Sequence, residues 1–183
     1  MRGFSLIETL VAVAILISAI VGPLTLATRS IRSAVYARDQ VLASFLVEEA
    51  IEYIRMMRDG NEHRRRSNWL FGLSADCLGQ LCEVDATKGR DEAVAQCSRR
   101  AQPPYGSFCQ PLAFQTATGK YGYKPQGAIG WEDTRFVREV RIDTIPNGNQ
   151  TSDDEAQVAV TVRWKTGNLP ERAITIREYL YDW

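Results

Sequence analysis

The sequence predicts an α+β protein in which one long N-terminal helix packs on a C-terminal antiparallel sheet of about three or four strands. Three observations support this prediction. An uncharged apolar run extends from Thr9 to Thr28, a helical pattern of apolar residues follows it as far as Arg58, and three alternating stretches lie after residue 134. A chain of 183 residues suits one domain with an appendage and is long enough to bury a core.

The composition excludes several classes of protein. The 22 Lys and Arg residues balance 22 Asp and Glu residues, which argues against a general nucleic-acid binder. An apolar content of 45% is too high for a disordered chain. His63 is the only histidine, and no Ser/His/Asp set, metal-ligand cluster or phosphate-binding loop is visible. We therefore expect neither an enzyme nor a cofactor or metal.

The uncharged run from Thr9 to Thr28 predicts a membrane-spanning helix. Its twenty residues would extend about 30 Å as a helix, which matches the hydrocarbon thickness of a bilayer. The alternative is a cleaved secretory signal, which needs a charged start, a shorter apolar core and a small-residue cleavage site. Because the run is long and leads into more helical sequence after Thr28, a retained membrane helix is favoured.

A single acidic residue, Glu8, stands at the start of this apolar helix. A carboxylate in that position costs several kcal/mol unless it has a partner, so it is by default a functional residue. If the chain were cut between Gly3 and Phe4, the new ammonium group of Phe4 would lie four residues from Glu8. That cation could come from the same chain or from a neighbouring copy.

The motif GFSLIETL at residues 3–10 resembles the type III signal of type IV pilins and of type II secretion pseudopilins. The resemblance implies a type IV pilin-like fold and a leader peptide, residues 1–3, that a prepilin peptidase removes after Gly3. It also implies N-methylation of Phe4 and a role for Glu8 as the assembly glutamate, which meets the Phe4 amine of a neighbouring subunit. Gly22 and Pro23 match the place where many pilin helices kink, since proline removes one helical hydrogen bond.

The resemblance also implies partners and a location. The partners are other pilin or pseudopilin subunits, bound through the N-terminal helix, the prepilin peptidase and a pilus assembly platform in the membrane. The precursor would cross the cytoplasmic (inner) membrane once, with its globular domain outside the cytoplasm, and then join a cell-surface or periplasmic filament. The arginine count, Arg2 before the span against Arg29, Arg32 and Arg38 after it, predicts the opposite orientation. For the orientation in the membrane we rely on the motif and the cysteines, which predict that the globular domain lies outside the cytoplasm.

The sequence after Thr28 predicts that the helix continues in amphipathic form over residues 29–60, behind a membrane and assembly half over residues 4–28. Its apolar stripe has spacings of 7, 4, 4, 3 and 4 and consists of Val35, Leu42, Leu46, Ala50, Tyr53 and Met57, widened by Val41, Phe45, Ile51 and Ile54. Met56 and Met57 are expected to be packing residues, and Asp59-Gly60-Asn61 is expected to end the helix.

A run of arginines lies near the predicted end of this helix and consists of Arg55, Arg58, Arg64, Arg65 and Arg66. It could form a patch for DNA, as in competence pili. A solvated helix end is the favoured interpretation, because charge clusters at helix ends are usually solvated, so a nucleic-acid partner is not expected.

A globular head is predicted over residues 61–183, and its first part, residues 61–133, is predicted to be a cysteine-bearing loop region. The spacing C-x4-C-x14-C-x11-C lacks the C-x2-C pairs of zinc and redox sites. Behind a membrane anchor, it predicts two disulfides among Cys77, Cys82, Cys97 and Cys109. Three pairings are open, and the sequentially local one, Cys77–Cys82 with Cys97–Cys109, is favoured. Free buried thiols are the alternative.

The second part of the head, residues 134–183, predicts an antiparallel meander of strands at residues 135–142, 158–164 and 174–180. Its apolar face is expected to cover the helical stripe from Val35 to Met57. Phe136, Val140 and Ile142 would share a face with a bulge between them. The acidic turn at residues 153–155 could hold calcium, but its consecutive ligands favour a plain solvated turn.

The leading functional hypothesis is a filament subunit that polymerises through its N-terminal helix. The large cysteine-bearing insertion and the Trp-rich C-terminus indicate a minor, tip-associated subunit rather than a major pilin. The alternative is a membrane-anchored extracytoplasmic binding protein or adhesin that does not polymerise. Crosslinking between the helix stripes of neighbouring copies distinguishes these two hypotheses. A membrane-tethered enzyme is the least favoured class.

Overall fold

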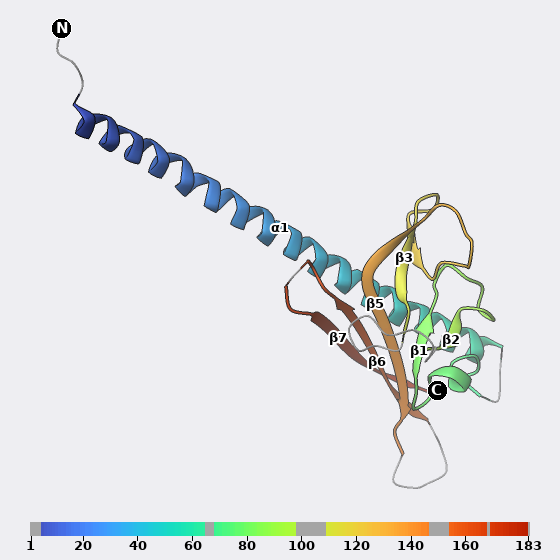
Figure 1. The fold of residues 1–183 in the computed structure, drawn as a ribbon. Coiled ribbons are helices and arrows are strands. Elements are labelled where there is room, and N and C mark those ends of the chain that lie inside the picture. The colour runs from blue at the N-terminus through green and yellow to red at the C-terminus, as the bar shows by residue number, and fades with distance from the viewer. Residues whose placement is uncertain (1–4, 65–67, 98–108, 147–153, 168, 183) are drawn as a thin grey trace. The chain divides into compact units, whose positions relative to one another are not determined.

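A computed structural model of the chain describes residues 5–64, 68–97, 109–146, 154–167 and 169–182. The chain divides into two compact units, residues 1–41 and residues 42–183, and we call the second unit the head. The elements, labelled in Figure 1, are α1 (Leu6–His63), α2 (Ser74–Cys77), β1 (Leu81–Val84), β2 (Val94–Gln96), β3 (Pro111–Gln115), β4 (Lys120–Gly122), β5 (Trp131–Thr144), β6 (Glu155–Trp164) and β7 (Arg172–Tyr181).

The end of α1 differs from the predicted stop, because the helix continues through Gly60 and Asn61 to His63. Gly60 provides space rather than a left-handed turn, since a Cβ at this position would overlap the Nη2 atom of Arg90. The same Nη2 donates hydrogen bonds of 2.9 Å to the carbonyls of Met56 and Met57. The Arg90 side chain is therefore held against the last turns of α1 by these two hydrogen bonds.

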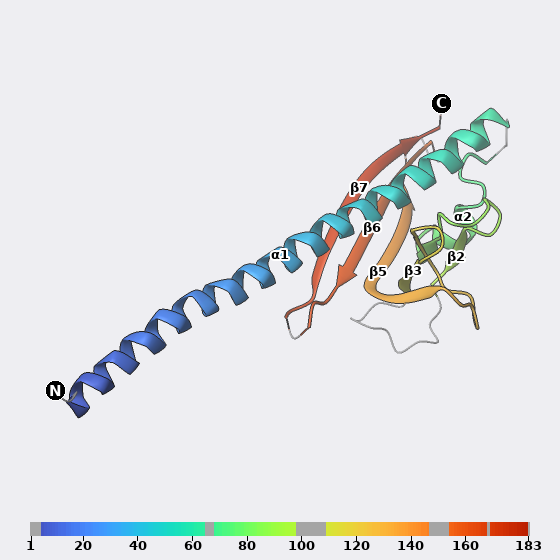
Figure 2. The ribbon, with the colours of Figure 1, turned by 90° about the horizontal axis from the view of Figure 1, so that it is seen from above.

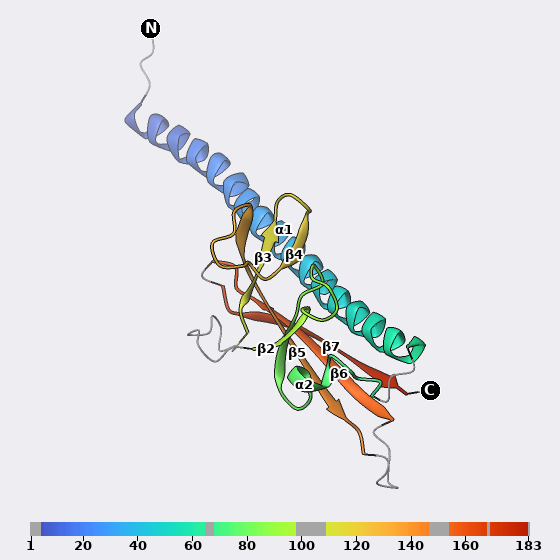
Figure 3. The same cartoon turned by 90° about the vertical axis from the view of Figure 1, so that its right-hand side faces the viewer.

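Among the described residues the sheet of the head has seven strands, so the predicted three or four strands are too few. The segment expected to be a loop region contains α2 and the four short strands β1–β4 (Figure 3). Two of these strands pair with different portions of β5, β1 at Cys82↔Val140 and β3 at Gln115↔Trp131. β2 and β4 then extend the sheet beyond β1 and β3 in the order β2-β1-β5-β3-β4.

The predicted meander is confirmed as the antiparallel succession β5–β6–β7. The pairing of β5 with β6 runs without interruption from Phe136↔Trp164 to Thr144↔Ala156, so the bulge predicted between Phe136 and Ile142 is wrong. Arg138 occupies the intervening position on the same face, and its side chain is fully buried. The alternation of apolar and polar residues in β5 is hard to recognise in the sequence, because Arg138 occupies a position where an apolar residue is expected.

The core lies between the C-terminal half of α1 and the strands that it crosses, as Figure 2 shows for β6 and β7. The buried residues that α1 contributes are Ala43, Leu46, Val47, Ala50, Ile51, Ile54 and Met57, and those of β6 are Ala156, Val158, Val160, Val162 and Trp164. Each large apolar side chain buried in this way contributes about 1.5–3 kcal/mol. Leu42 and Tyr53 are half-buried against the same core.

The predicted apolar stripe is too wide on one side. Phe45 is 62% exposed and Met56 is 51% exposed, so neither packs in the core. Val41 is also exposed. Val35 is exposed for another reason, because it lies in the unit before the head rather than opposite the core. The core occupies one side of a helix, and residues on the opposite side remain in contact with solvent whatever their hydrophobicity.

Candidate functional site

The site predicted from the sequence centres on Glu8, which lies in the first turn of α1. The carbonyl of Ser5 accepts hydrogen bonds from the backbone N–H groups of Glu8, at 3.0 Å, and Thr9, at 3.2 Å, which starts the helix. The Glu8 side chain is exposed, and within residues 5–64 and the other described segments it has no hydrogen bond or ion pair. Gly3 and Phe4 lie outside the described residues, so cleavage, N-methylation and the pairing of Glu8 with the Phe4 amine stay predictions.

The helix that follows Glu8 is long and apolar enough to cross a membrane. Its most apolar 18-residue window has a mean hydropathy of 2.5 and none of it is buried against the rest of the protein. Large apolar side chains such as Leu10, Ile15 and Ile20 are more than half exposed. An exposed apolar surface of this length indicates a single membrane-spanning segment.

The hydroxyl groups of this segment are satisfied within the helix itself. Thr9 Oγ1 donates to the carbonyl of Leu6 at 2.8 Å, and Ser18 Oγ donates to the carbonyl of Ala14 at 2.8 Å. Thr25 and Thr28 make the same kind of bond one turn back. Because an unsatisfied polar group in hydrocarbon is costly, these local bonds allow the helix to lie in lipid. Glu8 remains the only charged side chain of residues 5–28.

Gly22 and Pro23, where the resemblance places a kink, lie inside α1. Every residue on either side of them is helical. Proline has no N–H, so the carbonyl of Ala19 lacks its usual helical donor at this turn. The helix therefore lacks one backbone hydrogen bond at this turn, while the bend itself stays a prediction.

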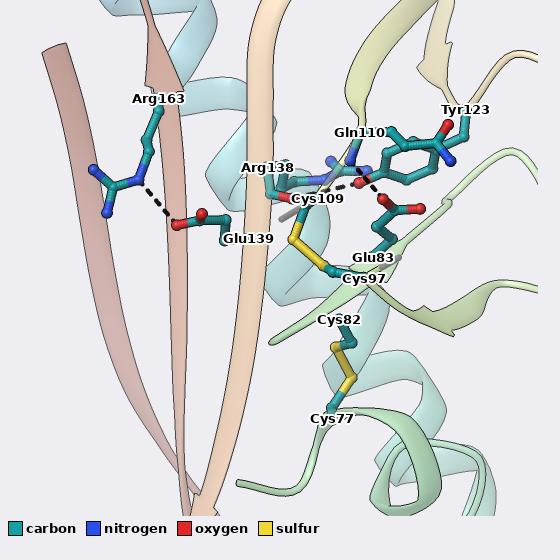
Figure 4. Close-up of a disulfide and its surroundings, with 10 residues drawn as sticks. All are labelled: Cys77, Cys82, Glu83, Cys97, Cys109, Gln110, Tyr123, Arg138, Glu139 and Arg163. Carbon is teal, nitrogen blue, oxygen red and sulfur yellow. Dashed lines mark hydrogen bonds and ion pairs between the residues drawn. A yellow bond between two sulfur atoms is a disulfide. The ribbon is translucent and has the colours of Figure 1, made fainter. Parts of the chain in front are cut away.

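Inside the head, sequence reasoning missed a buried polar cluster around Arg138 (Figure 4). Arg138 Nη1 donates to the carbonyl of Leu46 at 3.0 Å and to Glu49 Oε2 at 2.7 Å, and Nη2 donates to the carbonyl of Val84. One guanidinium thus ties β5 to both α1 and β1. The sequence does contain a signal for this burial. Arg138 is an even number of residues from Phe136, Val140 and Ile142, so in a strand it lies on the same face as these apolar residues.

Two buried acids complete this cluster. Glu83 Oε1 accepts a hydrogen bond of 2.6 Å from the backbone N–H of Gln110, and burial raises the pKa of the Glu83 carboxyl above its ordinary value. Asp85 Oδ1 accepts from the backbone N–H and the hydroxyl of Thr87, and its Oδ2 accepts from the N–H of Tyr123 at 3.3 Å. Burial also raises the pKa of the Tyr123 hydroxyl. These groups hold loops in place, and their polar atoms face protein partners rather than a substrate site.

The structure forms the two disulfides that the sequence favoured. Cys77–Cys82 joins α2 to β1 with a Cα–Cα distance of 5.0 Å. Cys97–Cys109 joins the residue after β2 to a residue shortly before β3 with a Cα–Cα distance of 4.5 Å. All four sulfurs lie in buried residues, and no cysteine is free, so the alternative of free buried thiols is wrong.

The acidic turn and the arginine run, the remaining candidates from the sequence, lie only partly within the described residues. Among those residues no group of three or more His, Cys, Asp and Glu side chains is placed to hold a metal ion. Asp153 lies outside them, and Glu155 opens β6. Of the arginine run, Arg65 and Arg66 also lie outside, while Arg55 pairs with Glu178 at 2.6 Å.

Comparisons with protein-family models, with curated proteins and with solved structures find no match to this chain. A function is therefore argued from the apolar helix, its single carboxylate and the disulfide-bonded head alone.

Proposed function

We propose that this chain is a structural subunit of a type IV pilus or of a type II secretion-like pseudopilus. In this proposal a prepilin peptidase removes residues 1–3, and the mature subunit polymerises through the N-terminal half of α1. The observation that carries the proposal is Glu8, the one charged side chain of an exposed apolar segment, which has no partner among the described residues.

The physical argument concerns what can bring membrane helices together. Lipid tails are as apolar as the side chains of residues 9–28, so hydrophobicity gives these helices little reason to associate. A carboxylate at the edge of the hydrocarbon has a strong reason to find a cation. The new Phe4 ammonium of a neighbouring copy supplies that cation, and the contact sets the register between subunits.

The head supports an extracytoplasmic location. Disulfides persist outside the cytoplasm and are rare within it, and the head contains two of them. Its helix-on-sheet arrangement resembles that of a pilin. The disulfide-bonded region between β1 and β3 is a large addition to the meander, and it favours a minor, tip-associated subunit over a major one.

The test is incorporation of the full chain into filaments in cells that carry a prepilin peptidase and an assembly platform. The fraction sheared from the cell surface, or the periplasmic filament fraction, is compared for the native chain and for Glu8→Ala. We expect Glu8→Ala to be inserted and cleaved normally but to be nearly absent from filaments.

Thr9→Ala is the matched control, because the Thr9 hydroxyl is satisfied by its own helix and should not affect incorporation. Normal incorporation of Glu8→Ala would refute the role of the carboxylate. A native protein that retains Met1 and works as a dispersed monomer would support the membrane-anchored binding protein instead.

A further inference from the structure

Two arginines follow the apolar span of α1 directly. Arg29 comes immediately after Thr28, the last residue of the uncharged run, and Arg32 is the next charged residue. Both lie within residues 1–41, which form a compact unit of their own, and the helix is continuous through them. Both arginines are exposed, and neither has a hydrogen bond or ion pair in the part of the chain that the structure describes. Their donors can therefore bind a ligand from outside the chain.

Among the described residues no acidic side chain neutralises this pair of arginines. Arg29 and Arg32 are three residues apart, so their side chains lie on the same side of the helix, about one turn apart, and repel each other. The run from Thr9 to Arg38 contains no acidic residue, and Asp39, which follows it, is buried. An anion between the two guanidinium groups would replace this repulsion by two attractive contacts. The pair therefore favours an anionic ligand.

Phosphate is an anion that suits this pair. A guanidinium group presents five N–H donors in a planar fork, and the fork matches the spacing of phosphate oxygens. Hydrogen bonds between two charged groups are about twice as strong as those between neutral groups. A phosphodiester has two unesterified oxygens, so it can accept hydrogen bonds from Arg29 with one oxygen and from Arg32 with the other.

The position of the pair along the helix makes a lipid the source of this phosphate. The uncharged run before Arg29 extends about 30 Å, which matches the hydrocarbon layer, and the headgroup layer outside it is about 5–7 Å thick. Arg29 and Arg32 lie about 1.5 Å and about 6 Å beyond Thr28, so both are at the level of the headgroups. Arg38 lies about 15 Å beyond Thr28, outside the headgroup layer, and about two and a half turns from Arg29, on the opposite side of the helix.

We propose that Arg29 and Arg32 form a binding site for the headgroup phosphate of an anionic phospholipid. A zwitterionic headgroup carries its own ammonium group, which competes with the arginines, whereas an anionic headgroup leaves its phosphate to them. Together with Glu8 at the other end of the apolar run, this contact sets the depth at which the helix lies in the bilayer. The inference does not depend on filament formation, because a membrane-anchored protein that never polymerises would make the same contact.

Native mass spectrometry of the full chain tests the site, after reconstitution in vesicles of equal amounts of phosphatidylglycerol and phosphatidylcholine. The native chain should retain phosphatidylglycerol preferentially, and Arg29→Gln or Arg32→Gln should each lower this preference about fivefold. Arg38→Gln is the matched control, since it removes the same charge from the same helix, and it should leave the preference unchanged. An equal loss in Arg38→Gln would reduce the effect to general attraction between positive charge and an anionic surface, and the site would be refuted.

A second measurement uses the native chain, so it does not depend on how well the variants insert. Phosphatidylglycerol with a photoreactive headgroup, incorporated in the same vesicles, should crosslink to residues 29–32. Crosslinks confined to other parts of the chain would overturn the proposal. Displacement of phosphatidylglycerol by excess inorganic phosphate would show that the pair binds free phosphate, and the lipid would be the wrong ligand. A chain that shows the lipid preference but forms no filaments would refute the proposed function and leave this inference standing.

Discussion

Arg138 donates a hydrogen bond of 2.7 Å to the carboxylate of Glu49 and so joins the middle of β5 to α1 inside the head. The Arg138 side chain is fully buried, while the Glu49 side chain is 35% exposed. The other hydrogen bonds of the Arg138 guanidinium go to the backbone carbonyls of Leu46 and Val84. Removing either the buried charge or its partners is costly, because the groups that stay behind are left in the protein interior without a partner.

Arg138→Ala should lower the free energy of unfolding of the head by about 3–5 kcal/mol, because it leaves two carbonyls and a carboxylate without their donor. Chemical denaturation of the full chain in detergent, followed by tryptophan fluorescence, measures the change. Arg141→Ala is the control, since Arg141 pairs with Asp143 at the surface and should contribute less than about 1 kcal/mol. Equal effects of the two substitutions would contradict the role assigned to Arg138.

Gly60→Ala should destabilise the head even though alanine is normally the better helix former by about 1 kcal/mol. The added methyl group would displace the Arg90 guanidinium from the carbonyls of Met56 and Met57. In an Arg90→Ala background the same substitution should become neutral or stabilising. A double-mutant cycle measured by denaturation checks this reversal of sign. Additive effects would show that Gly60 and Arg90 are independent.

Removal of the Cys97–Cys109 disulfide should destabilise the head more than removal of Cys77–Cys82. The sequence separations are 12 and 5 residues, for which the chain-entropy relation gives about 3 and about 2 kcal/mol. Paired substitutions to alanine, compared by their urea midpoints, test the order. The reverse order would indicate that contacts made by α2 outweigh loop closure.

Glu83→Gln should change how the stability of the head depends on pH. Burial raises the pKa of Glu83 in the folded state, so the unfolded chain releases this proton at a lower pH than the folded head does. Stability from this group is complete below the ordinary carboxyl pKa and falls as the pH rises through the raised value. Glutamine still accepts the hydrogen bond from Gln110 but carries no charge. The variant should therefore lack this fall, which denaturation at a series of pH values measures.

Gly3→Ala, or a bulkier residue at this position, should block removal of the leader if the resemblance of residues 3–10 reflects function. Mass spectrometry of the N-terminus of the purified protein separates the uncut chain, which begins at Met1, from the cut and methylated chain, which begins at Phe4. Cleavage of the Gly3 variants at the native rate would argue against a prepilin peptidase.

Patterns local to the sequence were enough to predict α1, the meander β5–β7 and the local disulfide pairing. An uncharged run, an alternation of period two and cysteines close in sequence are each visible within a few residues of one another. The four short strands β1–β4 were not predicted, because strands of three to five residues next to glycines and prolines carry almost no periodic signal.

The sequence by itself determined that this protein has an apolar N-terminal helix with one carboxylate at its start, followed by an amphipathic half and a sheet. Only the tertiary structure decided that Arg138 is buried, that Gly60 makes room for Arg90, and that Phe45 faces solvent. The reason is physical. The period of a helix or strand depends on neighbouring residues, whereas the burial of a charge or the exposure of an aromatic ring depends on partners that lie far away along the chain.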